Sequence, residues 1–142
     1  MAAATSSQLD VRHATIRRAV ETLGLDALIV TAPANIRYLT NHAGSAGTLV
    51  AAAGAMHLLV DFRYHESVRQ LQASASACPT LRLWPVPASY DEALLECLAE
   101  TGVTTVGFEA AHLTVARHEW LVRTAAARRV AVTLRPTERV VE

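Results

Sequence analysis

The sequence contains no lysine, few aromatic residues and no long apolar run. All 13 basic residues are arginines, and 13 acidic residues balance them, so the formal net charge is zero. Because binding to nucleic-acid phosphates requires an excess of positive charge, this balance argues against nucleic acid as a partner. No stretch approaches the roughly 18 apolar residues that a membrane-spanning helix needs. We therefore expect no membrane partner either.

Cysteine is also scarce, and Cys78 and Cys97 lack the CxxC spacing of metal or redox motifs. Residues 1–10 are small and polar, without the apolar segment of a signal peptide. These features indicate reduced thiols and a cytoplasmic location. We interpret residues 1–10 as a frayed N-terminus.

A chain of 142 residues is expected to form one domain that buries roughly 70% of its unfolded surface. Segments with helical spacing alternate with short apolar runs, and a hairpin centres on Gly54. Pro85 and Pro87 favour an edge position or a strand end for the run 81–86. The pattern predicts an α/β fold, a layered domain with a mixed, roughly six-stranded sheet flanked by helices. The expected strands are 27–30, 48–52, 56–60, 81–86, 104–108 and 131–134.

Six histidines suggest a metal site, but their spacing argues against one. The His-Glu-x-x-His motif of zinc proteases places two imidazoles on one helix face. The position of the second histidine is Arg69 after His65, and Val122 after His118. We therefore predict no metal ligand and no metal site within this chain.

Ser45 is a candidate nucleophile in the segment Gly44-Ser45-Ala46-Gly47. The nucleophile elbow requires glycine two residues before and after the serine, and Ala43 occupies the first of these positions. The phosphate-binding glycine motifs are absent as well. A tight, glycine-containing turn into a strand is the preferred interpretation.

The cluster Asp61-Phe62-Arg63-Tyr64 follows an apolar run directly. Loops at strand ends are common positions for sites in α/β sheets. An aspartate there also caps a following helix by accepting backbone N–H groups. From these residues alone, the two interpretations stay equally open.

The order and spacing of four motifs, from about Arg12 to Glu142, resemble the N-terminal domain of the creatinase, prolidase and aminopeptidase P family. The motifs are Asn35-Ile36-Arg37-Tyr38-Leu39-Thr40, Gly44-Ser45-Ala46-Gly47, Asp61-Phe62-Arg63-Tyr64 and Val106-Gly107-Phe108-Glu109. The resemblance implies an N-terminal α/β domain over 11–135 and the start of a linker at 136–142. The linker would lead to a catalytic domain that this chain does not contain.

In peptidases of this family, the catalytic domain holds two divalent metal ions (Mn, Co or Zn) and hydrolyses the bond before proline. The resemblance therefore implies a parent Xaa-Pro metallopeptidase, with no catalytic residue and no cofactor in this chain, which we expect to be inactive alone. It also implies that the domain shapes the substrate cleft and the oligomer interface. The expected partners are its own C-terminal catalytic domain, a second copy in a homodimer and a proline-containing peptide.

By position in the motifs, the resemblance implies that Tyr38, His42 and Arg63 line the substrate cleft. His42 replaces an aromatic residue found in many relatives. Two alternatives remain open: a stand-alone protein-interaction or small-molecule-binding α/β domain, and the N-terminal domain of a creatinase-type hydrolase.

Overall fold

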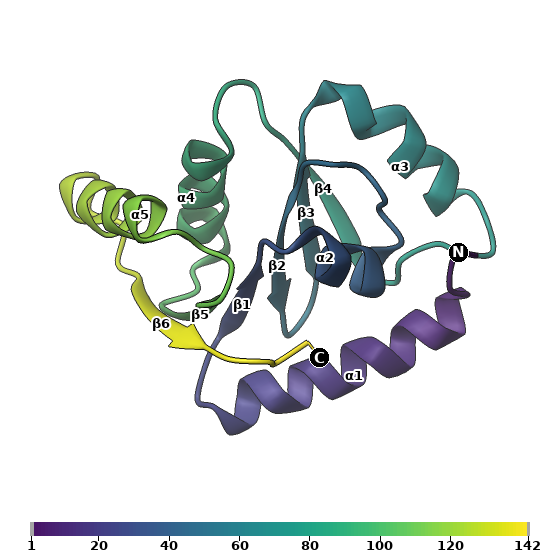
Figure 1. Ribbon diagram of the computed structural model, residues 1–142, viewed down its shortest axis with the longest axis horizontal. Helices are drawn as coiled ribbons and strands as arrows, with labels where there is room; N and C mark the ends of the chain where they lie inside the picture. The colour runs from purple at the N-terminus through teal and green to yellow at the C-terminus, as the bar shows by residue number, and fades with distance from the viewer. Residues whose placement is uncertain (1, 142) are drawn as a thin grey trace.

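A six-stranded sheet in the order β4-β3-β2-β1-β5-β6 lies at the centre of the computed structural model, which describes residues 2–141 (Figure 1). Strand β2 pairs antiparallel with both of its neighbours, and all other neighbouring strands are parallel. The mixed sheet confirms the predicted fold class. The strands are β1 Ala27–Val30, β2 Thr48–Ala52, β3 Met56–Val60, β4 Leu81–Pro85, β5 Thr105–Glu109 and β6 Thr133–Thr137.

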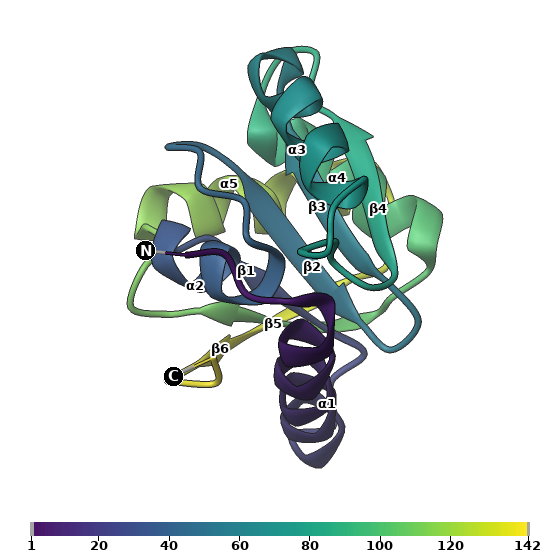
Figure 2. The same cartoon turned by 90° about the vertical axis from the view of Figure 1, so that its right-hand side faces the viewer.

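Helices cover both faces of this sheet. The first three helices pack with one apolar cluster, and the last two pack with a second cluster on the opposite face (Figures 1 and 2). No helix among residues 2–141 is long and apolar enough to cross a membrane. The helices are α1 Ser6–Thr22, α2 Pro33–Thr40, the short 3-10 helix η1 Phe62–Tyr64, α3 His65–Gln72, α4 Tyr90–Thr101 and α5 Val115–Ala127.

Strand β1 connects the two layers. Leu28 and Val30 pack into the cluster beneath α1 to α3, whereas Ala27 and Ile29 pack into the cluster beneath α4 and α5. All four side chains are fully buried. A strand covered on both faces is apolar at every position, which explains the continuous run Ala-Leu-Ile-Val.

The structure differs from the expected frayed N-terminus. Helix α1 starts at Ser6, and Thr5 and Gln8 form a reciprocal capping box. Ala4 is buried, and its backbone N–H and carbonyl bind the side-chain amide of Asn41. Polar contacts order this segment, and such contacts leave no apolar pattern in the sequence from which the order could be predicted. Met1 lies outside the described residues.

Regular structure extends past the expected domain end at 135. Strand β6 continues to Thr137 and pairs with β5 along its whole length. Val140 and Val141 then pack against the core beneath α1. The strand was predicted only as far as 134, because Arg135 and Pro136 break its apolar pattern, as edge strands permit. The segment 136–141 therefore belongs to the domain in part.

Gly107 in β5 fills a place where the chain has no room for a side chain. A Cβ atom there would lie 2.7 Å from Leu25 Cδ1 and 2.9 Å from Thr137 Cγ2. We predict that Gly107→Ala lowers the free energy of unfolding by about 1–2 kcal/mol through overpacking. Gly54→Ala is the control, because nothing lies within 4 Å of its Cβ position. Urea unfolding of both variants checks this, and equal stabilities would contradict it.

His13 on α1 is fully buried, and its Nε2 donates to the Leu39 carbonyl at 2.6 Å. Its Nδ1 is a buried atom without a partner among the described residues. Burial lowers the pKa of His13 below its ordinary value, against the opposing effect of the bond to Leu39. Burial lowers the pKa of His57 in the same way.

These shifts predict a loss of stability in mild acid. The unfolded chain takes up protons near pH 6.5, whereas the folded chain resists them, so the unfolded state gains protons first. The free energy of unfolding should therefore be highest above about pH 6.5 and fall as the pH is lowered from about 6.5. Urea titrations at these pH values measure the slope. His13→Gln should make the slope shallower, and an unchanged slope would contradict the assignment to His13.

Candidate functional site

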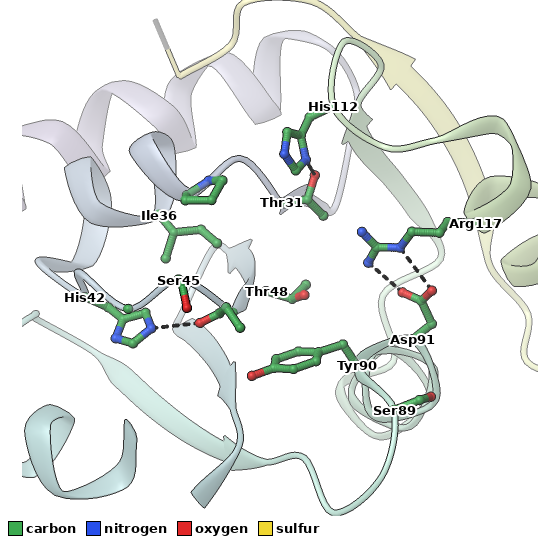
Figure 3. A pocket seen from close by; sticks show the side chains of 14 residues that line it. Thr31, Ile36, His42, Ser45, Thr48, Ser89, Tyr90, Asp91, His112 and Arg117 are labelled. Atoms are coloured by element: carbon green, nitrogen blue, oxygen red, sulfur yellow. Dashed lines mark hydrogen bonds and ion pairs between the residues drawn. The ribbon is translucent and has the colours of Figure 1, made fainter. Parts of the chain in front are cut away.

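A pocket of about 410 Å³ opens at the edge of the sheet where the parallel strands end (Figure 3). Ligand sites of α/β sheets usually form at this edge. The pocket combines small, polar, imidazole and charged side chains. Its lining residues are Thr31, Pro33, Ile36, His42, Gly44, Ser45, Ala46, Gly47, Thr48, Ser89, Tyr90, Asp91, His112 and Arg117.

Four separate segments contribute to this pocket. Thr31 directly follows β1, and Thr48 is the first residue of β2. Residues 89–91 begin α4, and Arg117 lies in the first turn of α5. Because β2 is antiparallel to β1, its first residue lies at the same edge as the end of β1.

The loop before β2 folds around the imidazole of His42. His42 is buried, and its Nε2 donates to the Ala46 carbonyl at 3.0 Å. The ring also meets the Tyr64 ring edge to face, with centroids 5.1 Å apart. A Cβ atom at Gly44 would lie 2.6 Å from the His42 ring and 2.7 Å from the Tyr64 ring. Glycine at 44 thus lets the backbone approach both rings.

Ser45 makes a hydrogen bond with the Tyr64 hydroxyl at 2.9 Å. Its partner is therefore a phenol, whereas an activated serine needs a general base. The nearby imidazole of His42 is bound to a carbonyl instead. These contacts favour the structural turn that the sequence predicted over a nucleophile.

Two carboxylates are held in fixed positions near the pocket. Arg117 donates through Nε and Nη2 to both oxygens of Asp91, at 3.1 and 2.7 Å. Asp61 receives the same two-bond contact from Arg63, at 2.7 and 3.0 Å, and accepts a bond from the Tyr90 hydroxyl at 2.6 Å. The carboxylates are thus paired rather than free to act as bases.

The contacts of Asp61 shift the titration of its neighbours. The hydrogen bonds from Arg63 and then Tyr90 hold the pKa of Asp61 well below its usual range. Burial, and then the bond to Asp61, raises the pKa of Tyr90 to about 12. Asp61 also accepts from the Arg63 backbone N–H and caps η1, which supports the capping interpretation of this cluster.

Of the three predicted site residues, the structure places only His42 in this pocket. Tyr38 lies on the exposed side of α2, and the Arg12 guanidinium covers its ring at 4.1 Å. Arg63 is exposed, binds Asp61 and lies over the Tyr64 ring at 5.1 Å. The structure therefore does not bring these three side chains together, and their contact with substrate stays a prediction.

Glu109, the last residue of β5, binds the start of α2 across the sheet. Its Oε1 accepts from the backbone N–H groups of Thr31 and Ala32 at 2.7 and 2.9 Å. Its Oε2 accepts from the Asn35 side-chain amide. No side chain of the N-cap residue Ala32 can cap α2, so Glu109 supplies the acceptor.

The family model of the Creatinase/Prolidase N-terminal domain matches residues 12–142. The chain belongs to this family. The match confirms the resemblance that the sequence motifs suggested.

Known relatives and solved structures agree with this assignment. The N-terminal domain of cytoplasmic peptidase PepQ from Mycobacterium tuberculosis H37Rv superimposes with a TM-score of 0.75 and 26% identity, over 92% of this chain and 95% of that chain. Xaa-Pro dipeptidase from Bacillus anthracis has a TM-score of 0.78 and 21% identity, over 94% of this chain and 35% of its own. The uncharacterized peptidase YqhT of Bacillus subtilis (strain 168) is 38% identical over 47 residues, which are 33% of this chain and 13% of YqhT. The chain thus spans about a third of the dipeptidase.

The side chains of residues 2–141 do not fit the pair of metal ions that the family resemblance implies for a parent enzyme. No group of three or more His, Cys, Asp or Glu gathers as a metal site among the described residues. The histidine rings have other contacts: His13, His42 and His65 with backbone carbonyls, His57 with Trp84, His112 with Thr31 and His118 with Phe108. Burial also raises the pKa of Cys78 and Cys97 to about 12, which keeps both thiols protonated.

Sequence reasoning missed the side of the pocket formed by Tyr90, Asp91, His112 and Arg117. Asp91 and Arg117 are 26 positions apart on different helices, so no local spacing links them. The sequence does contain one indication: Ser89 and Thr114 are N-cap residues, and the helices that they cap start at the edge of the sheet where the pocket lies. Residues of those first turns necessarily lie near the strand ends.

The Glu109 contact predicts a large effect of a single substitution. Glu109→Ala leaves the Thr31 and Ala32 N–H groups without their acceptor, and we expect a loss of about 2–4 kcal/mol in the free energy of unfolding. Glu119→Ala, an exposed glutamate on α5, is the control and should change stability by less than about 0.5 kcal/mol. Urea unfolding measures both. Equal values for the two variants would contradict the capping role.

Proposed function

We propose that this chain is the non-catalytic N-terminal domain of an Xaa-Pro metallopeptidase, a dipeptidase or aminopeptidase. The observation that carries the proposal is the match along nearly the whole chain to the separate N-terminal domain of PepQ, at 26% identity. The partial coverage of the Bacillus anthracis dipeptidase supports a longer parent protein. In that parent, a second domain would hold two divalent metal ions and carry out hydrolysis.

The proposed work of this domain is to shape the substrate cleft and the oligomer interface. Support comes from the carboxyl edge of the sheet, where the pocket opens beside exposed groups. Phe62 is 82% exposed, and Arg63 next to it is also exposed. Exposed aromatic and arginine side chains are typical of interaction surfaces. We propose a homodimer, a proline-containing peptide as substrate and a cytoplasmic location, the last by analogy with PepQ.

Two other functions compete with this proposal. A creatinase-type hydrolase would have the same N-terminal domain, since the family includes both activities. A stand-alone binding domain is favoured by the pocket, which is built entirely from this chain. The substrate that the longer protein hydrolyses distinguishes the creatinase alternative from our proposal. The length of the encoded protein distinguishes the stand-alone domain from it.

The test compares the 142-residue chain with the longest protein that its reading frame encodes. We predict that the chain alone does not hydrolyse Ala-Pro, with or without Mn²⁺, because its side chains do not fit a metal pair. The longer protein should hydrolyse Ala-Pro in the presence of Mn²⁺. Release of proline from Ala-Pro measures both activities.

Three results would contradict the proposal. Turnover by the chain alone would place the catalytic groups in this domain. Turnover of creatine instead of Ala-Pro by the longer protein would favour the creatinase alternative. A reading frame that ends at Glu142 would favour the stand-alone domain.

A further inference from the structure

The hydroxyl of Thr48 has no hydrogen-bond partner among the described residues, although the residue is only 2% exposed. The Thr48 oxygen is not one of the fully buried side-chain atoms that lack a partner. Since Thr48 lines the pocket, we infer that this oxygen is accessible from the open space of the pocket. Figure 3 shows this hydroxyl within the space between His42 and Arg117. Because this oxygen is open to the pocket, water can reach it, and a ligand atom can take the place of that water. Its position therefore indicates a ligand atom or solvent as partner.

Arg117 presents a second donor to the same space. Its Nε and Nη2 are taken up by Asp91, whereas Nη1 lies on the side of the guanidinium that faces away from Asp91 (Figure 3). Nη1 has no acceptor among residues 2–141 in the hydrogen bonds of the structure. The pair with Asp91 fixes the guanidinium, so its remaining donors are held in place without a ligand.

The charge around these donors favours a negatively charged group. Asp91 and Arg117 are the only charged side chains that line the described pocket, and they neutralise one another. Helices α4 and α5, of 12 and 13 residues, both begin at this edge; α4 carries Asp91 and Glu92 in its first turn, whereas α5 has no acidic residue there. Their N-terminal ends carry partial positive charge. The start of α2 contributes less, because Glu109 already occupies it.

We propose that this pocket binds the carboxylate of a small organic acid, with the Thr48 hydroxyl and the Arg117 guanidinium as donors. Arginine suits a carboxylate because its planar donors match the two oxygens. Pro33 and Ile36 supply an apolar wall for the rest of the ligand. A volume of about 410 Å³ limits the ligand to a small molecule or the end of a peptide.

This inference goes beyond the proposed function and is tested without catalysis. The probes are N-acetylglycine and its neutral counterpart N-acetylglycinamide, which differ only in the carboxylate. Titration of the ¹⁵N-labelled 142-residue chain, followed by NMR, reports binding at each amide. We expect saturable shifts at residues 44–48 and at the Arg117 Nε–H for the acid, with a Kd of about 1–10 mM for a ligand of this size.

Substitutions at Thr48 test the donor directly. Thr48→Val keeps the shape and removes the hydroxyl, so N-acetylglycine should bind about tenfold more weakly. Thr48→Ser keeps the hydroxyl and should retain binding. Thr22→Val is the matched control, because Thr22 is exposed at the end of α1 and does not line the pocket.

Four outcomes of these titrations would overturn the proposal. Equal binding of acid and amide would show that the carboxylate is not recognised. Tighter binding of inorganic phosphate than of the acid would assign the pocket to a different anion. An absence of shifts at residues 44–48 and 117, or a Thr48→Val chain that binds as tightly as the unmodified chain, would rule out the site. Hydrolysis by a longer protein bears on none of these results.

Discussion

The carboxylate of Glu109 is the contact on which the site edge depends. It joins the end of β5 to the turn after β1 and to the first residues of α2 through Thr31, Ala32 and Asn35. Hydrogen bonds to a charged acceptor are stronger than those between neutral groups, and this carboxylate makes three. Two motifs about seventy positions apart in the sequence are therefore joined by one set of hydrogen bonds. Thr31, held in this way, is also a wall of the pocket.

A second junction fixes the other end of α2. Asn41 adopts a left-handed conformation with φ of 68° and ends the helix. Its side-chain amide binds both backbone groups of Ala4 and the carbonyl of Ser76. Asparagine tolerates this conformation better than most residues, and its amide both donates and accepts. The next residue is His42, so the N-terminal segment and the loop 74–77 together position the pocket loop.

The sequence was sufficient to predict the layers of the fold, because buried strands such as Ala27–Val30 and capped helices leave local patterns. It also indicated the Asp61 cap as one of two interpretations, because a cap depends on adjacent residues, and the structure decided between them. The sequence did not predict the ordered start of α1 at Thr5, where polar contacts order the chain. It also did not predict that the last strand continues through Arg135, because an edge strand needs no continuous apolar pattern. The pocket could be predicted only in part, since the pairing of Asp91 with Arg117 arises from tertiary packing.

The reversed direction of β2 explains why a pocket forms at all. In a parallel sheet, the segment after β1 would cross back to the opposite edge before the next strand. Here α2 has only 8 residues, about 12 Å, and β2 starts at the edge where β1 ends. The loop 41–48 therefore stays among the carboxyl ends of β1, β3 and β5 and brings His42 and Thr48 there. One antiparallel strand thus adds a loop of the chain to the α/β edge and forms one wall of the pocket.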